Sequence, residues 1–318
     1  MEGLIEQDVF LPSTRPDADY QGRDLVFLVG SPRSGTTWLQ RLLASHPSVQ
    51  TGQESNLFSW YVGPQLRVWH DEVNRELRPE TSIGRGGGVG LPCYLEQEEF
   101  FAILKDYMLR LVHVITQNVP EGGLFLEKTP NHALFLPEIH ELLPESRIIH
   151  IVRDARDVTA SLLAVSQSWG ASWAPDHPRD AAWTWVKHVH AVREAARKLP
   201  GMKLCEITYE RLWTSPESTL AEVAAFLGLC WSPQEIREAV ARNRGEAVKA
   251  SGGTPIPMHG EYVKHSGGTV KEPKDFVRQA EPGAGAKSLS LWQRLWVWRV
   301  AHTTMEEHGY HWPLSDVF

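Results

Sequence analysis

Residues 29–38, VGSPRSGTTW, combine glycines, hydroxyls and one cation in a pattern that can bind phosphate. Gly30 and Gly35 have the spacing of a Walker A loop, G-x-x-x-x-G-K-[ST], but Thr36 stands where the lysine of that motif would be. Arg33 supplies a positive charge earlier in the loop. Backbone N–H groups of such a turn, its hydroxyls and the guanidinium can together hold an anion. The alternative is a tight turn that uses Gly and Ser for geometry alone.

The missing lysine narrows the choice of ligand. In P-loop NTPases that lysine reaches the β- and γ-phosphates while a neighbouring hydroxyl and an acidic residue hold Mg²⁺. The apolar run RIIHIV (147–152) is followed by Arg153 rather than by an aspartate, so the acidic residue that would hold Mg²⁺ is missing too. The loop therefore favours a single terminal phosphate, with chemistry on a group attached to it and no metal.

A second set of residues could bind a separate phosphate. Arg153 follows the strand-like run 147–152, and Ser161 lies about two turns into the helix expected next. Ligand-binding groups in α/β proteins gather at the carboxyl ends of strands. Arg153 and Ser161 are therefore expected to converge on an anion. The alternative is that Arg153 pairs with a carboxylate and Ser161 has no particular role.

Taken together, P-R-S-G-T-T-x-L and I-x-x-V-R-D-x-x-D-V-x-x-S resemble the motifs of the sulfotransferases that use 3′-phosphoadenosine 5′-phosphosulfate (PAPS). The similarity is to a bacterial branch that resembles the tyrosylprotein sulfotransferases, and it extends over residues 26–58, 127–157 and 207–227. In this family the first loop holds the 5′-phosphosulfate and the second motif holds the 3′-phosphate. The resemblance implies that PAPS contacts Arg33, Ser34, Gly35, Thr36, Thr37, Trp38, Arg153, Ser161 and Tyr209, the last at adenine.

The family also closes a C-terminal loop over the 3′-phosphate. The nearest matches here are Arg278, Gly283 and Lys287, in a segment, RQAEPGAGAKS, that departs from the common pattern. We expect these three residues to complete the cofactor site.

The same resemblance implies the catalytic groups. Sulfuryl transfer by in-line displacement requires positioning and stabilisation of charge. Arg33 would stabilise the leaving 5′-phosphate, and Lys128, in the run EKTP, would contact the transferring group. Glu54, in TGQES, aligns with the glutamate base of the tyrosylprotein branch, and His132 is the alternative base. The structural alternatives are a surface salt bridge for Lys128 and a solvated loop carboxylate for Glu54.

The acceptor is expected to be a hydroxyl of a small molecule, lipid or glycan. Several aromatic residues in the variable stretches either shape its pocket or fill the core: Trp60, Tyr61, Trp69, Trp169 and Trp173. Two other functions remain open. A P-loop phosphotransferase would depend on magnesium, and a non-catalytic nucleotide-binding module would keep the phosphate loop without turnover.

Composition excludes some partners. The chain has 318 residues and a formal net charge of −7, which argues against nucleic-acid binding. Its three cysteines are far apart and do not form a metal or redox motif. The acidic N-terminus does not resemble a signal peptide, and we find no apolar run long enough to span a membrane. We expect a cytoplasmic protein without metal, either a monomer or a homodimer.

The positions of these motifs require an α/β fold. Short apolar runs at 25–30, 124–127, 147–152 and 203–207 predict buried parallel strands. Helical patterns follow at 36–45, 131–143, 154–165, 180–199, 216–227 and 289–307. We expect a P-loop-like central parallel β-sheet flanked by helices, in a single domain over residues 1–318 with an N-terminal extension, 1–22. Two stretches, 54–95 and 245–287, are expected to be long loops on the substrate side.

Overall fold

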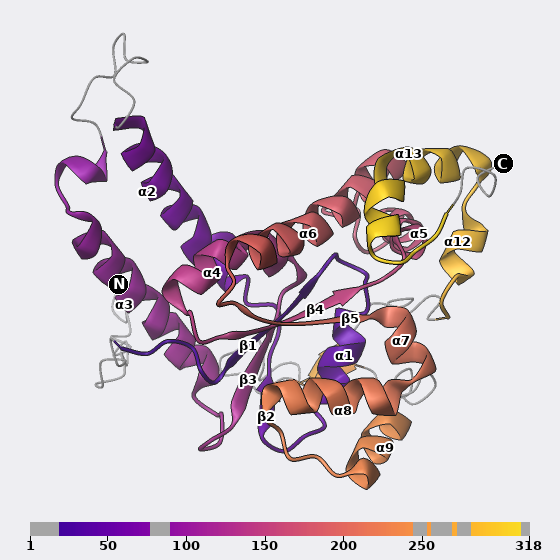
Figure 1. The fold of residues 1–318 in the computed structure, drawn as a ribbon, viewed down its shortest axis with the longest axis horizontal. Coiled ribbons are helices and arrows are strands. Elements are labelled where there is room, and N and C mark those ends of the chain that lie inside the picture. Colours follow the sequence, from indigo (N-terminus) through magenta and orange to yellow (C-terminus); the bar gives the residue numbers. More distant parts are fainter. Residues whose placement is uncertain (1–18, 77–89, 244–252, 256–268, 272–280, 313–318) are drawn as a thin grey trace, which may run out of the picture.

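The computed structural model describes residues 19–76, 90–243, 253–255, 269–271 and 281–312 (Figure 1). A five-stranded parallel sheet has the order β2-β3-β1-β4-β5. Its strands are β1 (Leu25–Gly30), β2 (Val49–Thr51), β3 (Leu124–Lys128), β4 (Arg147–Val152) and β5 (Lys203–Thr208). The predicted α/β fold with a central parallel sheet is confirmed, and all four predicted strands are present. The short edge strand β2 was not predicted.

The strand order explains where the motifs meet. β1 lies in the middle, with β3 on one side and β4 on the other, and all six of its residues are buried. The chain leaves β1 toward β2 and β3 and then crosses to β4, so the direction of winding changes between β1 and β4. Loops at the carboxyl ends of strands on the two sides of such a switch diverge and leave room for a ligand. The phosphate loop follows β1, and Arg153 follows β4.

Alternate residues of β1 serve two separate cores, as the period of a strand requires. Leu25, Phe27 and Val29 pack in one cluster, and Val26 and Leu28 pack in another. Four helices contribute to the first cluster: α2 (Gly63–Glu76), α3 (Gln97–Thr116), α4 (Leu136–Leu142) and α6 (Pro178–Lys198). The opposite face is covered by α1 (Thr36–Leu43), α7 (Tyr209–Thr214), α8 (Pro216–Leu227) and α9 (Pro233–Arg242).

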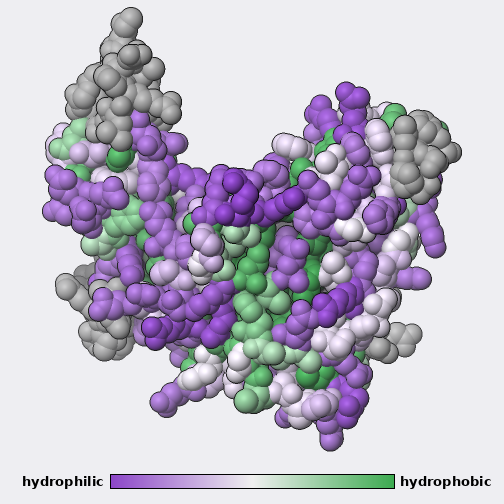
Figure 2. Space-filling model, in the orientation of Figure 1, coloured by the Kyte–Doolittle hydropathy of each residue, from purple (hydrophilic) through white to green (hydrophobic). Residues whose placement is uncertain are grey.

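A third cluster lies beyond the end of the sheet, where α5 (Ala155–Ser166) and α13 (Leu291–Glu307) pack with α6. In Figure 1 these helices form one projection and α2 with α3 forms another. Figure 2 shows hydrophilic residues over most of this face, with hydrophobic residues mainly in its middle, where Figure 1 draws the strands. Every residue of β1 and β3 is buried, as their continuous apolar runs predicted, whereas the edge strand β5 is partly exposed.

The expectation of a loop over 54–95 is wrong for much of that stretch. Residues Leu57–Val62 form a π-helical turn that leads directly into α2, and Leu91–Cys93 form a short 3-10 helix. Val62, Leu66 and Trp69 lie at helical spacing and are all buried. Trp69 stacks on Phe100 of α3 with 4.1 Å between ring centroids, which ties the two helices together. The frequent glycines and tryptophans of this stretch concealed the helical period.

The second expected loop, 245–287, contains regular structure as well. Gly253–Pro255 (β6) and Thr269–Lys271 (β7) form an antiparallel pair, and Ala284–Ser288 form the short helix α12. The predicted helix at 131–143 begins as a 3-10 helix, Pro130–Phe135, and continues as α4. Most of the predicted N-terminal extension lies outside the described residues. Within the described part of the chain, no helix is both long and apolar enough to cross a bilayer.

Candidate active site

The phosphate loop makes a tight turn between β1 and α1. Arg33 and Gly35 both have left-handed backbone conformations, with φ of 74° and 97°. A Cβ atom at Gly35 would run into the ring of Tyr209, so this position requires glycine for space as well as for its backbone. The hydroxyl of Ser34 is completely buried and has no hydrogen-bond partner within the described part of the chain. An unpaired buried hydroxyl is costly, and an anion in the turn would satisfy it.

Arg33 connects the two predicted phosphate motifs. Its Nε donates a hydrogen bond to the Ser161 hydroxyl on α5 over 3.1 Å. The guanidinium carbon also lies 5.5 Å from the centroid of the Trp169 ring, within range of a cation–π contact. The structure therefore brings a residue of the first motif and a residue of the second into direct contact, although they are 128 positions apart.

Arg153 occupies the predicted position at the end of β4, where it is buried. Its Nη2 donates to Asp157 over 3.2 Å, and its guanidinium lies 4.2 Å from the ring centroid of Tyr209. The pairing with a carboxylate, expected as the structural alternative, is thus present. The Nε of Arg153 is nevertheless buried without a hydrogen-bond partner among the described residues. One donor of this arginine stays available to a ligand.

The aromatic residues beside these cations form one cluster. Trp38 lies edge-to-face against Tyr209, with 5.6 Å between ring centroids, and against Trp213, with 5.8 Å. The indole of Trp38 also donates to the backbone carbonyl of Asn243. Burial raises the pKa of Tyr209 to about 12, so its hydroxyl stays protonated at neutral pH. Trp38 and Tyr209 therefore lie together beside the phosphate loop, as their predicted contact with the same cofactor requires.

Asp157 connects Arg153 to the C-terminal segment. Its two carboxylate oxygens accept hydrogen bonds from the backbone N–H of Gly283, over 2.8 Å, and of Ala286, over 2.9 Å. A Cβ atom at Gly285 would come within 2.9 Å of the Asp157 backbone, so the segment packs closely on α5. The predicted cofactor residue Gly283 therefore reaches this site. Lys287 is exposed on the same segment, and Arg278 lies outside the described residues.

The predicted catalytic pair lies at the end of β3. Nζ of Lys128 is 2.6 Å from Oε1 of Glu54. The Lys128 side chain is 9% exposed, whereas that of Glu54 is 42% exposed. The two residues are 74 positions apart, and their contact places a buried cation beside a solvent-accessible carboxylate. A hydroxyl that approaches from solvent can reach Glu54.

His132, the alternative base, is buried in the core and not exposed to an acceptor. Its ring is completely buried between Phe27 and Phe58, with centroid separations of 5.6 and 6.0 Å. Nε2 faces the backbone N–H of Phe58 at 3.1 Å and accepts its hydrogen bond. Burial lowers the pKa of His132 to about 3. These contacts argue against His132 as the base and leave Glu54 as the accessible group.

The tryptophans considered for the acceptor pocket fall into two groups. Trp69 belongs to the core, as the stack on Phe100 shows, and its indole is 2% exposed. Trp60, Tyr61 and Trp173 are exposed. Trp173 lies against Trp169 with 5.7 Å between ring centroids, and Trp169 is the ring beside Arg33. These exposed aromatic rings remain available to an acceptor.

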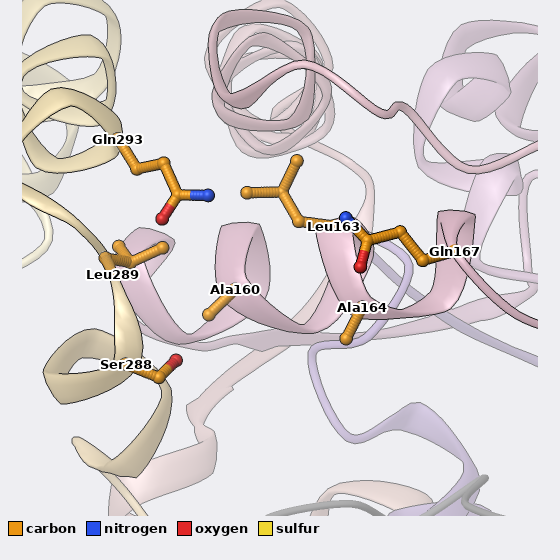
Figure 3. A pocket seen from close by; sticks show the side chains of 7 residues that line it. All are labelled: Ala160, Leu163, Ala164, Gln167, Ser288, Leu289 and Gln293. Atoms are coloured by element: carbon orange, nitrogen blue, oxygen red, sulfur yellow. The ribbon is translucent and has the colours of Figure 1, made fainter.

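A small open pocket lies between α5 on one side and the end of α12 and the start of α13 on the other (Figure 3). Its volume is about 170 Å³, and its lining residues are Ala160, Leu163, Ala164, Gln167, Ser288, Leu289 and Gln293. The lining contains two amides and a hydroxyl but no charged side chain. It is therefore not suited to a phosphate. No cluster of three or more His, Cys, Asp or Glu side chains suited to a metal occurs in the part of the chain that the structure describes.

Two contributing residues, Gln40 and Asp157, were not singled out from the sequence. Gln40 of α1 donates to the Thr51 hydroxyl over 2.7 Å and to the Gly52 carbonyl over 2.9 Å. Asp157 was part of the quoted motif without a role of its own. Each acts on a partner that is distant in the sequence or belongs to the backbone. Only the spacing of Asp157 and Ser161, one helical turn apart on α5, offered a signal that they share a face.

Comparison with known proteins identifies the family. The model of the sulfotransferase family matches residues 25–233 of the chain. That range contains both phosphate motifs, Lys128 and Glu54. The chain therefore belongs to the sulfotransferase family, and the resemblance found in its sequence is confirmed.

Named relatives agree with this assignment. The chain is 27% identical over 210 residues to a putative protein-tyrosine sulfotransferase of Caenorhabditis briggsae, covering 66% of this chain and 67% of that protein. It is 23% identical over 208 residues to protein-tyrosine sulfotransferase 2 of Gallus gallus, covering 65% of this chain but only 52% of the relative. The chain thus spans between one half and two thirds of these relatives.

Solved structures show the same fold. The sulfotransferase domain from the curacin biosynthetic pathway superposes with a TM-score of 0.55 at 20% identity, over 91% of this chain and 98% of that domain. A mouse sulfotransferase solved in complex with PAP, the 3′,5′-bisphosphate product of PAPS, also gives a TM-score of 0.55, at 15% identity, over 93% of this chain and 91% of that protein. Identities this low establish the fold alone.

Proposed function

We propose that this protein transfers a sulfuryl group from PAPS to a hydroxyl acceptor by in-line displacement, with Glu54 as the general base. The observation that carries the proposal is the contact between the two phosphate motifs through Arg33 and Ser161. Beside this contact, the Ser34 hydroxyl and the Arg153 Nε are buried without partners within the described residues. Polar groups left open at two points of one site fit a ligand that carries two separate phosphates.

The cofactor when bound would supply an activated sulfuryl group on its 5′-phosphate. Arg33 and the N-terminus of α1 would hold that phosphate and stabilise the charge that develops on it as the leaving group. Arg153 and Ser161 would hold the 3′-phosphate, with Gly283 and Lys287 completing the site. Trp38 and Tyr209 would contact the adenine.

Glu54 and Lys128 would act on the acceptor side. Glu54 is the exposed partner of the pair and can take the proton of an attacking hydroxyl, a role worth about 10²–10⁴ in rate. Lys128 is almost buried, and its ammonium group lies beside that carboxylate. As negative charge shifts during transfer, Lys128 is the cation positioned to stabilise it.

The acceptor we propose is a hydroxyl on a small molecule, lipid or glycan, held by the exposed rings of Trp60, Tyr61 and Trp173. The names of the relatives favour a second candidate, a protein tyrosine. A phenolic acceptor and a sugar hydroxyl both fit aromatic contacts. A panel of hydroxylated acceptors that includes a tyrosine peptide would separate these possibilities.

The first test is calorimetric titration with PAP, in parallel with ATP and Mg²⁺. We expect PAP to bind without metal and Mg·ATP to bind far more weakly, because the loop lacks the lysine that reaches a γ-phosphate. Preferential binding of Mg·ATP would instead support a phosphotransferase. Tight binding of PAP with no transfer to any acceptor would support a non-catalytic nucleotide-binding module.

The second test concerns the base. Glu54→Gln should lower kcat by about 10²–10⁴ and leave the dissociation constant of PAP unchanged, because the side chain lies on the acceptor side. Glu96→Gln provides a control, since Glu96 is an exposed glutamate that caps the start of α3. Full turnover by Glu54→Gln would show that another group accepts the proton.

A further inference from the structure

Glu127 is a buried carboxylate that none of the roles above uses. It lies on β3, directly before Lys128, and is 2% exposed. Burial raises its pKa to about 7. A buried carboxylate lowers stability unless its oxygens accept hydrogen bonds, so the groups that surround this one indicate what it does.

The groups around Glu127 belong to the neighbours of the catalytic pair: Thr129 follows Lys128, and Ser55 and Asn56 follow Glu54. Thr129 donates its hydroxyl hydrogen to Oε1 of Glu127 over 2.5 Å. The other oxygen, Oε2, is buried without a hydrogen-bond partner among the described residues. Ser55, next to Glu54, lies near enough to lower the pKa of this carboxyl group. Thr129 in turn accepts a hydrogen bond from the backbone N–H of Asn56 over 3.3 Å. Glu127 therefore holds Asn56 through Thr129, and Ser55 lies beside its carboxylate.

His132 completes the surroundings of this carboxylate. Because its Nε2 accepts from Phe58, the neutral ring must carry its hydrogen on Nδ1. Nδ1 lies 3.7 Å from Oε1 of Glu127 and has no hydrogen-bond partner among the described residues. The buried histidine thus presents an N–H toward the carboxylate. His132 therefore borders the Glu127 carboxylate on the side of the core.

The other end of the same loop is held from α1. Gln40 donates to the Thr51 hydroxyl and the Gly52 carbonyl, and the Thr51 hydroxyl donates to the Leu126 carbonyl on β3 over 2.7 Å. Thr51 and Gly52 on one side of Glu54 and Asn56 on the other are therefore fixed by hydrogen bonds, while Glu54 extends from the loop to Lys128.

From this arrangement we infer that Glu127 is a positioning residue, which holds the loop 52–56 so that Glu54 faces Lys128 and the acceptor. The inference rests on the proposed role of Glu54 as the base. Glu127 itself cannot touch an acceptor, because it is buried beneath the loop. It acts on Glu54 through Thr129 and Asn56, and it directly precedes Lys128 on β3.

The first experiment measures the loop without requiring an acceptor. Hydrogen–deuterium exchange of the peptide that spans residues 52–58 should rise at least tenfold in Glu127→Ala and in the milder variant Thr129→Val. PAP affinity should stay within twofold of the wild type, since within the described part of the chain neither residue hydrogen-bonds to the phosphate loop. Glu138→Gln is the matched control, because Glu138 is also a buried carboxylate but pairs with Arg67 on α2. Unchanged exchange in both variants would overturn the inference.

The second experiment is a double-mutant cycle with Glu54→Gln, measured as PAP-dependent release of 4-nitrophenol from 4-nitrophenyl sulfate. Thr129→Val should lower kcat about 10- to 100-fold, with little change in KM for PAP, because a small displacement of a reacting group has a large effect on rate. In the Glu54→Gln background, Thr129→Val should change kcat less than threefold, because the carboxylate that Thr129 helps to position is already absent.

The two proposals fail in different ways. If Glu54→Gln retains full turnover, the assignment of the base is wrong, yet the exchange of residues 52–58 still shows whether Glu127 holds the loop. If Thr129→Val lowers kcat equally in the presence and absence of Glu54, its effect does not pass through Glu54 and the positioning role is excluded. Restored turnover in Thr129→Ser, which keeps the bridging hydroxyl, would support the role.

Discussion

The two ends of the proposed cofactor site are built in different ways. The transfer end consists of the phosphate loop, the loop 52–56 and the end of β3, and its key contact joins Lys128 to Glu54. The 3′-phosphate end consists of Arg153, α5 and the segment 283–286, and its key contact joins Arg153 to Asp157. Each end pairs one buried cation with one carboxylate. In the first pair the carboxylate is exposed, whereas Asp157 is 1% exposed.

This difference predicts different behaviour. The exposed carboxylate of the transfer end can exchange protons with an acceptor. The buried carboxylate of the 3′-phosphate end has no access to solvent, and its oxygens hold the backbone of a segment 126 positions away. We infer that the transfer end determines turnover and the other end determines affinity. Variants at the two ends should therefore separate kcat from PAP binding.

The largest expected effect is on turnover at the transfer end. Lys128→Met keeps most of the volume of the side chain and removes its charge. We expect kcat to fall about 10²–10³-fold, as for the loss of one group that stabilises charge in a transition state. PAP affinity by calorimetry should change little. A large loss of PAP affinity with normal kcat would place Lys128 on the phosphate rather than on the transferring group.

The next effect is on affinity at the 3′-phosphate end. Arg153→Ala removes charge-assisted hydrogen bonds worth about 1.5–3 kcal/mol, or about 10- to 150-fold in the dissociation constant of PAP. AMP, which lacks the 3′-phosphate, is the matched ligand and should bind both proteins equally. Equal loss of affinity for PAP and AMP would mean that Arg153 supports the fold of the site instead of binding the 3′-phosphate.

The sequence predicted the two ends unequally, for a physical reason. At the transfer end, the glycine spacing before α1 predicted the phosphate loop, and the resemblance to the family supplied Lys128 in EKTP and Glu54 in TGQES. The other end depends on contacts between distant segments. Arg153 and Ser161 could be predicted from a strand followed by a helix, but the contact of Gly283 with Asp157 could not. The helices α2 and α3, which pack together through Trp69 and Phe100, were both missed.

The smallest expected effect distinguishes two roles of Asp157. In Asp157→Asn, an amide N–H₂ replaces one oxygen, so one of the backbone N–H groups of Gly283 and Ala286 loses its acceptor. If the segment 283–286 helps to bind the 3′-phosphate, PAP affinity should fall about three- to tenfold, the value of one hydrogen bond. Exchange of the 281–288 backbone should rise in parallel. The same substitution also removes the ion-pair partner of Arg153, which would free that guanidinium for phosphate. An increase in PAP affinity would therefore show that Asp157 mainly competes with the 3′-phosphate for Arg153, and that docking of the C-terminal segment contributes little to the cofactor site.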